Sequence, residues 1–287
     1  MAGVKGRVVV ITGAGGGLGR QHALLFAEEG ARVVVNDLGG DRHGTGSSSA
    51  MADAVVSEVT SAGGEAVANY DNVATLEGGQ RVIETALDAF GQIDIVVNNA
   101  GILRDRSFHK MTPEEWDAVL RVHLYGSFNV TRAAWPHMRA QRFGRVIVTT
   151  STSGLFGNFG QANYGAAKMG MVGLINTLAV EGVRYNVTAN AIAPLANTRM
   201  TADVIPDDDL ARLDPAYASP AVVHLASEEC TDTGMIILAS AGHYARIGFM
   251  QARGVQFHEV PTVEDLALAW DEIVDLTDSA PGRNPLA

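Results

Sequence analysis

The 287-residue chain has little cysteine, few aromatic residues and few positive charges. Its single cysteine, Cys230, excludes a disulfide within the chain and is typical of a protein kept in a reducing compartment. The 21 lysines and arginines are outnumbered by 32 aspartates and glutamates, which gives a formal net charge of −11. Because nucleic acids and anionic membranes attract basic surfaces, we expect neither as a partner.

Long hydrophobic runs are also missing, so the sequence predicts no membrane-spanning helix. The residues after Gly3 enter an apolar strand directly, without the pattern of a signal peptide. The last residues, Pro285-Leu-Ala287, differ from the peroxisomal address SKL. These observations together lead us to expect a cytoplasmic protein, and no metal site is expected.

The sequence does contain many apolar residues, 47% in total, in short continuous runs separated by helical stretches. This alternation predicts an α/β fold in which a doubly wound, parallel, seven-stranded sheet is covered by helices on both faces. One domain of residues 1–287 is expected. The predicted strands are Val8 to Ile11, Val33 to Asn36, Ala66 to Asn69, Ile95 to Asn98, Val146 to Thr150, Thr188 to Ile192 and Met235 to Leu238.

A glycine-rich turn, Thr12 to Gly19, follows the first predicted strand and precedes a helical stretch, Gln21 to Glu29. Glycines permit a tight turn and close approach of the backbone, and the N–H groups at a helix start bind pyrophosphate. Asp37 ends the second strand, where its carboxylate can bind ribose hydroxyls and repel a 2′-phosphate. The pattern therefore predicts a dinucleotide site that favours NAD over NADP, although Arg20 and Arg42 lie close enough in sequence to leave that preference open.

Tyr164-Gly-Ala-Ala-Lys168 places a phenol and an ammonium one turn apart on the same face of a predicted helix. A neighbouring cation stabilises a phenolate and lowers the pKa of tyrosine from about 10 toward neutrality. Tyr164 could then exchange a proton with an alcohol, while Ser151 orients the substrate oxygen. By itself this spacing is common in helices, and its combination with the dinucleotide motif is what indicates alcohol oxidation.

Several other segments carry local signals. The run Thr112-Pro-Glu-Glu115 predicts the start of a helix that runs toward His123. The glycine- and serine-rich segment Gly39 to Ser49 is predicted to be a mobile surface loop rather than a wall of the adenosine site. Residues of about 196–218 are expected to form a lid, and about 248–287 a C-terminal extension containing an amphipathic helix over Thr262 to Leu276.

In their order and spacing, these motifs resemble those of the short-chain dehydrogenase/reductase family. The resemblance rests on Thr12 to Gly19, on Asn98-Asn-Ala-Gly101, on Ser151 and on Tyr164 to Lys168, and it covers most of the chain. Within the family, the segments around Asn36 to Asp41, Asn98 to Ser107, Arg121 to Leu124 and Gly157 to Tyr164 look like the dehydrogenase region of the peroxisomal multifunctional type 2 enzymes.

This resemblance implies NAD-linked oxidation of a secondary alcohol, most specifically of an (R)-3-hydroxyacyl-CoA, by a homodimer or homotetramer. Arg104, Arg106 and Lys110 are then candidates to bind CoA, although a solvated charged loop is the simpler interpretation. It also implies the catalytic residues Ser151, Tyr164 and Lys168, and a cofactor site made of Gly13, Gly17, Leu18, Gly19, Asp37, Asp71, Asn72, Asn99, Ala100, Gly101, Tyr164, Lys168, Ile192, Pro194 and Thr198.

The chain departs from the family pattern at three positions. Leu195 replaces a glycine, and Thr198 comes one residue early, in the segment that resembles the nicotinamide-binding one. His123 stands where the family has asparagine, so we hypothesise that it supports a proton relay near Lys168; a satisfied core histidine is an equal alternative. Two other functions stay open, a 17β-hydroxysteroid or other secondary-alcohol dehydrogenase and a non-catalytic NAD sensor.

Overall fold

The computed structural model of the chain describes residues 3–196 and 213–282. They divide into one compact unit that extends to Arg246 and a smaller one that begins at Ile247. Within the described residues, no helix combines the length and the apolar character needed to cross a bilayer. Residues 197–212, which include Thr198 and most of the expected lid, lie outside the described part of the chain.

The first unit contains a sheet with the strand order β3-β2-β1-β4-β5-β6-β7-β8. Each strand pair from β3 through β7 is parallel, as predicted from the apolar runs. Buried valines, isoleucines and alanines of both sheet faces form the core. The strands are β1 (Val8–Thr12), β2 (Arg32–Asn36), β3 (Glu65–Asn69), β4 (Ile95–Asn98), β5 (Gly144–Thr149), β6 (Val187–Leu195), β7 (Ile236–Ser240) and β8 (His243–Ile247).

The eighth strand is the difference from the predicted seven. β8 follows β7 after a two-residue turn, Ala241-Gly242, in which both residues have positive φ (46° and 81°). So short a connection joins antiparallel strands only, and this backbone suits a tight hairpin. The sequence-based prediction missed β8 because its residues, HYARI, are half exposed and do not form an apolar run.

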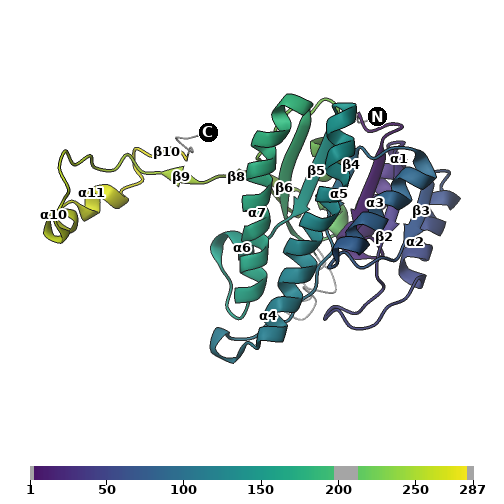
Figure 1. The fold of residues 1–287 in the computed structure, drawn as a ribbon, viewed down its shortest axis with the longest axis horizontal. Coiled ribbons are helices and arrows are strands. Elements are labelled where there is room, and N and C mark those ends of the chain that lie inside the picture. The colour runs from purple at the N-terminus through teal and green to yellow at the C-terminus, as the bar shows by residue number, and fades with distance from the viewer. Residues whose placement is uncertain (1–2, 197–212, 283–287) are drawn as a thin grey trace. The chain divides into compact units, whose positions relative to one another are not determined.

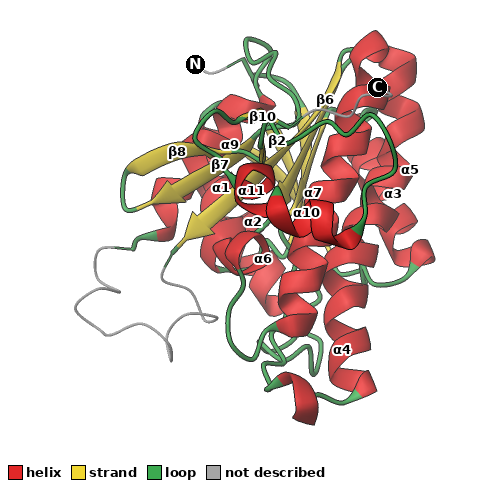
Figure 2. Ribbon diagram, turned by 90° about the vertical axis from the view of Figure 1, so that its left-hand side faces the viewer, coloured by secondary structure: helices red, strands yellow, loops and turns green. Residues whose placement is uncertain are grey.

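Helices cover the sheet on both sides, as Figures 1 and 2 show. On one side α3, α5 and α7 pack beside one another, and on the other α1 packs between α2 and α9. The main helices are α1 (Gly17–Glu28), α2 (Ala50–Ser61), α3 (Leu76–Phe90), α4 (Pro113–Leu120), α5 (Gly126–Gln141), α6 (Thr152–Phe156), α7 (Ala162–Gly182) and α9 (Ser219–Ala226). Short helical turns are η1 (Phe108–Lys110), η3 (Val183–Tyr185) and η4 (Pro215–Ala218).

The helix predicted to start at Thr112 begins there with a complete capping box. The Thr112 hydroxyl accepts from the Glu115 N–H, and the Glu115 carboxylate accepts from the Thr112 N–H. The helix does not continue regularly to His123, because α4 ends at Leu120 and a π-turn, η2 (Arg121–Tyr125), connects it to α5. Such turns are rare and occur mainly at functional sites.

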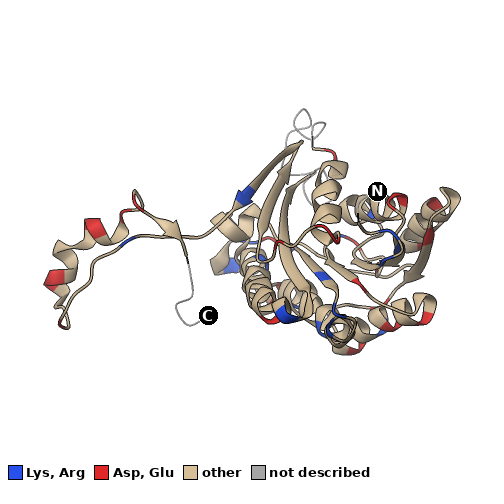
Figure 3. Ribbon diagram, turned by 90° about the horizontal axis from the view of Figure 1, so that it is seen from above, with Lys and Arg blue, Asp and Glu red and all other residues tan. Residues whose placement is uncertain are grey.

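The second unit contains a short hairpin of β9 (Met250–Gln251) and β10 (Ala280–Pro281) and two short helices, α10 (Val263–Leu268) and α11 (Trp270–Val274). The predicted single helix over Thr262 to Leu276 is therefore wrong, since the helix is interrupted at Ala269. A capping box at Thr262 starts α10, and both helices carry acidic first turns, drawn red in Figure 3.

A buried histidine makes the fold sensitive to acid. His22 of α1 is fully buried, and its Nδ1 lies 2.8 Å from the Ser219 Oγ at the start of α9. Burial lowers the pKa of His22 from 6.5 to about 3. The unfolded chain therefore binds a proton below pH 6.5 that the folded chain does not accept until about pH 3. Stability from this group is complete above pH 6.5 and is lost as the pH falls, by about 2 kcal/mol at pH 5.

We predict that the free energy of unfolding falls less between pH 7.5 and pH 5 in His22→Gln than in the unchanged chain, by about 2 kcal/mol. Glutamine keeps a polar side chain but does not titrate. Urea denaturation at the two pH values measures it. His137→Gln, at an exposed position of α5, is the matched control and should behave as the unchanged chain does. The same pH dependence in His22→Gln and the unchanged chain would contradict the prediction.

Candidate active site

The strand order places the motif residues together. The chain leaves β1 toward one side of the sheet and β4 toward the other, so the carboxyl ends of β1 and β4 flank the point where ligands bind in doubly wound sheets. A cavity of about 340 Å³ opens there. Its walls include most of the predicted cofactor residues: Gly13, Gly17, Leu18, Asp37, Asp71, Asn72, Asn99, Ala100 and Gly101.

The glycine turn fits a pyrophosphate. Gly13 has φ of 64°, and a Cβ there would lie 2.7 Å from the Ala100 Cα, so only glycine allows this approach of β1 to β4. α1 begins at Gly17 with extended backbone at Gly16, which leaves the N–H groups of its first turn available. Gly19 does not line the cavity; a Cβ there would lie 2.3 Å from the Gly13 carbonyl oxygen, so it allows the helix to pack on the turn.

Asp37 lies across the same turn. Its carboxylate accepts from the backbone N–H groups of Gly15 (2.8 Å) and Gly39 (2.7 Å), which fixes it at the end of β2. Arg20, one of the two arginines that left the cofactor preference open, is paired with Glu58 of α2. The arrangement suits an unphosphorylated ribose, because the cavity presents a fixed carboxylate and Arg20 is engaged elsewhere.

Asp71 and Asn72 line the cavity beyond β3. The Asp71 carboxylate is 2.5 Å from Arg81 Nε of α3 and 2.9 Å from Asn69 Nδ2 of β3, and these two contacts hold it in place. These residues could contact the adenine end of a cofactor.

The Asn98 to Gly101 segment braces the strands. The Asn99 amide donates to the carbonyl oxygens of Thr12 and Gly13 (both 3.1 Å), and the Thr12 hydroxyl accepts from the N–H groups of Asn99 and Ala100 (both 3.0 Å). Sequence analysis missed Thr12, although its position directly before Gly13 was a usable signal. Its buried hydroxyl joins the end of β1 to the segment that follows β4.

Tyr164 and Lys168 come from the first turns of α7, next to β5. Lys168 is buried, its Nζ donates to the Thr149 carbonyl oxygen at the end of β5, and it lies 5.3 Å from the centroid of the Tyr164 ring. Ser151 follows the same strand and caps α6 by accepting from the Ser153 N–H (3.1 Å). These three predicted catalytic residues thus lie together beyond the carboxyl end of β5.

The electrostatics differ from the prediction that Lys168 lowers the pKa of Tyr164. Burial raises the pKa of Tyr164 to about 12, and the hydrogen bond with Ser151 opposes that shift only in part. Burial also lowers the pKa of Lys168 to about 7, so its positive charge is only partly present at neutral pH. Desolvation is thus the largest cause of the shift in both groups.

His123 lies in the π-turn η2 and packs edge-on against Tyr164, with the ring centroids 5.2 Å apart. Its Nε2 lies 3.0 Å from the Ile102 N and 2.9 Å from the Ile102 carbonyl oxygen, of which one tautomer can bond only one. Its Nδ1 is buried and has no hydrogen-bond partner among the described residues. Burial, and then the charge of Lys168, hold the pKa of His123 well below 6.5. A Cβ on Gly101 would lie 2.3 Å from this ring.

Ile192 does not reach the cavity. Its side chain is fully buried in the core, and its carbonyl oxygen accepts from the Thr150 N–H (2.8 Å). The role of Ile192 in cofactor binding stays a prediction. Pro194 is the fourth of the five β6 residues that pair with β7; it lies opposite Ala239 and is partly buried.

The segment Gly39 to Ser49 also differs from the prediction of a mobile loop. The Leu103 N–H donates to the Arg42 carbonyl oxygen (2.9 Å), and His43 Nδ1 lies 3.0 Å from the Leu103 carbonyl oxygen. A Cβ on Gly44 would lie 3.1 Å from Ile102 Cδ1. We call residues 39–48 the strap, because they join the end of β2 to the segment after β4 across one side of the cavity.

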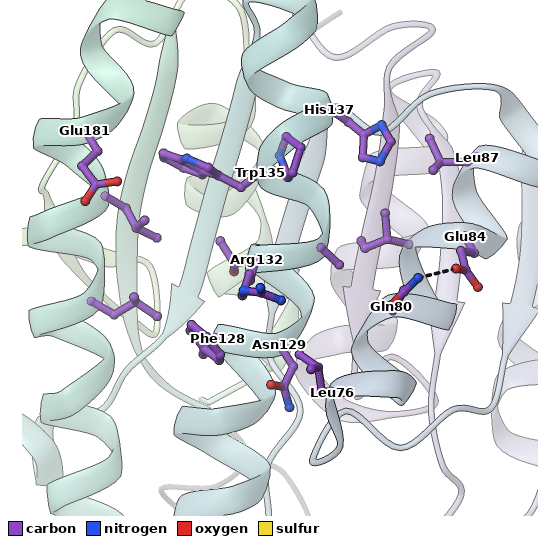
Figure 4. Close-up of a pocket in the computed structure, with 16 residues that line it drawn as sticks. Leu76, Gln80, Glu84, Leu87, Phe128, Asn129, Arg132, Trp135, His137 and Glu181 are labelled. Atoms are coloured by element: carbon purple, nitrogen blue, oxygen red, sulfur yellow. Dashed lines mark hydrogen bonds between the residues drawn. The ribbon is translucent and has the colours of Figure 1, made fainter.

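A larger cavity, of about 590 Å³, lies between α3, α5 and α7 and is lined by side chains such as Phe128, Trp135 and Leu178 (Figure 4). It contains none of the motif residues. The smaller cavity is therefore the candidate active site, because the predicted cofactor-binding residues line it.

Comparison with known proteins gives the family. A family model described as short chain dehydrogenase matches residues 7–209. The Mycobacterium tuberculosis protein Rv0148, named as a short-chain type dehydrogenase/reductase, is 59% identical over 277 residues, covering 96% of this chain and 97% of that protein. The peroxisomal multifunctional enzyme type 2 of Mus musculus is 51% identical over 278 residues, covering 96% of this chain but 37% of the mouse protein.

Structural comparison agrees with this. A crystal structure of a short chain dehydrogenase from Mycobacterium avium superposes with a TM-score of 0.83 at 44% identity and covers 95% of this chain and 96% of that one. These matches confirm the resemblance drawn from the motifs, including its link to the multifunctional type 2 enzymes. The chain belongs to the short-chain dehydrogenase/reductase family and is an oxidoreductase that acts on CH–OH groups.

Proposed function

We propose that this protein oxidises an (R)-3-hydroxyacyl-CoA to the 3-oxoacyl-CoA with NAD. The observation that carries the proposal is that Tyr164, Lys168 and Ser151 lie together after β5, next to β4, and that the Asp37 cavity opens at the ends of β1 and β4. The three residues do not themselves line that cavity. The similarity to multifunctional enzymes and to the Mycobacterium tuberculosis protein named hydroxyacyl-CoA dehydrogenase ChsB1, 42% identical over 223 residues, supports the acyl-CoA class.

In this proposal the glycine turn and the start of α1 hold the pyrophosphate, and Asp37 holds the ribose. A bound nicotinamide ring would supply the hydride acceptor. The Ser151 hydroxyl orients the substrate oxygen, Tyr164 takes the alcohol proton, and protonated Lys168 stabilises the negative charge on the phenolate. With a pKa of about 12, Tyr164 carries its proton at neutral pH, and this form suits donation to a ketone in the reverse reaction. Oxidation of the alcohol requires the phenolate form, which protonated Lys168 stabilises.

Tyr164→Phe should fold and bind NAD but lose at least about a hundredfold of alcohol oxidation, because it removes the group that exchanges the proton. NAD reduction is measured with (R)- and (S)-3-hydroxyacyl-CoAs and with 17β-hydroxysteroids. We expect the unchanged chain to oxidise the (R)-thioester and Tyr164→Phe to oxidise none. Tyr185→Phe, which removes a hydroxyl bonded to Arg139 (2.7 Å), is the control and should keep full turnover.

Retained turnover in Tyr164→Phe would overturn the catalytic assignment. Activity confined to steroids would favour the alternative of a hydroxysteroid dehydrogenase, and NAD binding without turnover of any substrate would favour the sensor.

Asp37→Ser should shift cofactor preference toward NADP, because it removes the carboxylate that would repel a 2′-phosphate. Turnover with NAD and NADP at equal concentrations gives the ratio. We expect about a tenfold or larger fall in the NAD to NADP ratio, since loss of a charged hydrogen bond costs about 1.5–3 kcal/mol. Asp88→Ser, at an exposed position of α3, should leave it unchanged. A clear NADP preference in the unchanged chain would refute the choice of NAD.

We also propose that His123 supports proton movement behind Lys168. A neutral imidazole packed on Tyr164, with a buried unpartnered Nδ1, supports this role. His123→Ala should lower turnover about tenfold or more and shift the pH–rate profile, because general acid–base groups contribute about 10²–10⁴ to rates. His123→Asn, which restores a side chain that can bond Ile102, should recover part of the loss. Full turnover with an unchanged profile in His123→Ala would show instead a purely structural histidine.

A further inference from the structure

Three arginines line the candidate active-site cavity of this strongly acidic chain: Arg42, Arg104 and Arg121. Arg121 is paired with Asp117, Nε to carboxylate at 2.7 Å. Arg104 differs, because the one hydrogen bond of its side chain with the described residues runs from Nε to a neutral acceptor, the His43 carbonyl oxygen of the strap (3.1 Å). Among the described residues, its two terminal guanidinium nitrogens have no hydrogen-bond partner.

The backbone of Arg104 is fixed beside the proposed catalytic tyrosine. Its carbonyl oxygen accepts from Asn163 Nδ2 (3.0 Å), and Asn163, which directly precedes Tyr164, is fully buried. The same Asn163 amide donates to the Glu115 carbonyl oxygen (3.1 Å), and its Oδ1 accepts from the Tyr164 N–H (2.8 Å). Arg104 is thus tied at its backbone to the start of α7 and at its side chain to the strap.

The carboxylates near Arg104 are engaged by other groups. Asp41 accepts from the N–H groups of His43 (2.8 Å) and Thr45 (2.9 Å) within the strap. Glu115, whose pKa is lowered chiefly by the Thr112 N–H and to a small extent by Arg104, bonds Arg106 at 2.7 Å. The cavity therefore holds a partly buried guanidinium that is oriented by a neutral carbonyl and whose terminal N–H groups remain available.

We propose that Arg104 binds a phosphate group of a ligand in this cavity. A guanidinium presents a planar fork of N–H donors that matches phosphate oxygens, and orientation by the strap reduces the entropy lost on binding. The phosphate belongs either to the pyrophosphate of the dinucleotide or to the phosphates of an acyl-CoA. The second source rests on the proposed function, whereas the first does not.

The experiment compares Arg104→Gln and Arg104→Lys with the unchanged chain. NAD affinity is measured directly by titration calorimetry. Then kcat/KM at saturating NAD is measured for a 3-hydroxyacyl-CoA and for the same acyl group on pantetheine, which carries no phosphate. A charge-assisted hydrogen bond contributes about 1.5–3 kcal/mol, so Arg104→Gln should lose about 10- to 100-fold on the phosphate-dependent measurement, and Arg104→Lys less.

Arg139→Gln is the matched control, because it removes the same charge from an exposed side chain of α5 that bonds the Tyr185 hydroxyl (2.7 Å) and does not line the cavity. It should change neither measurement by more than about threefold. Weaker NAD binding with an unchanged CoA to pantetheine ratio identifies the dinucleotide as the phosphate source. Unchanged NAD binding with a loss confined to the CoA thioester identifies the acyl-CoA.

Two results overturn the proposal: NAD affinity and the CoA to pantetheine ratio both unchanged in Arg104→Gln, or equal losses on both thioesters with unchanged NAD affinity. If the unchanged chain oxidises neither thioester, the proposed function fails, and the NAD titration still tests whether Arg104 binds phosphate.

Discussion

The hydrogen bonds between Thr12 and Asn99 are the constraint on which the candidate site depends. They fix the distance between β1 and β4 at the point where the strand order reverses. Only because those two strand ends are held together, without a Cβ at Gly13, does the backbone leave a cavity there for a dinucleotide. Gly101, on the β4 side of the same contact, then leaves room for His123, and His123 packs on Tyr164. The segment that Thr12 holds, Asn99 to Gly101, therefore lines the cavity on one side and contacts His123 on the other.

Burial decides the charges at that tyrosine. The same desolvation that raises the pKa of Tyr164 lowers the pKa of Lys168, so the two groups are driven toward their neutral forms together. The Thr149 carbonyl oxygen offers Lys168 one acceptor, and His123 is held neutral by burial. A positive charge arriving beside this cluster would stabilise the phenolate. In the proposed mechanism, proton exchange would then depend on the ligand bound in the cavity as well as on Tyr164 and Lys168.

Much of the fold could be predicted from the sequence, because apolar runs and glycine turns report local structure directly. The parallel strands, the turn before α1 and the start of α4 at Thr112 all follow from short-range patterns. β8 escaped because a half-exposed edge strand lacks an apolar run, and the break at Ala269 escaped because periodicity alone does not show where a helix ends.

The contacts of the strap could not be predicted from the sequence for a different reason. A run of glycines and serines predicts a loop that carries no packing of its own, and the strap instead is ordered by contacts with residues about 60 positions away, from Arg42 and His43 to Leu103 and Arg104. No local pattern encodes such pairings. Because these pairings bring Arg104 to the cavity, the candidate site contains two basic side chains, Arg104 and Lys168, whose charges respond differently to pH. Lys168 is buried with a pKa near neutrality and can change its charge, whereas a guanidinium remains positive throughout the working range of pH. In the proposals made above, Lys168 takes part in proton exchange and Arg104 binds a phosphate. The segments that carry these two residues meet at Asn163.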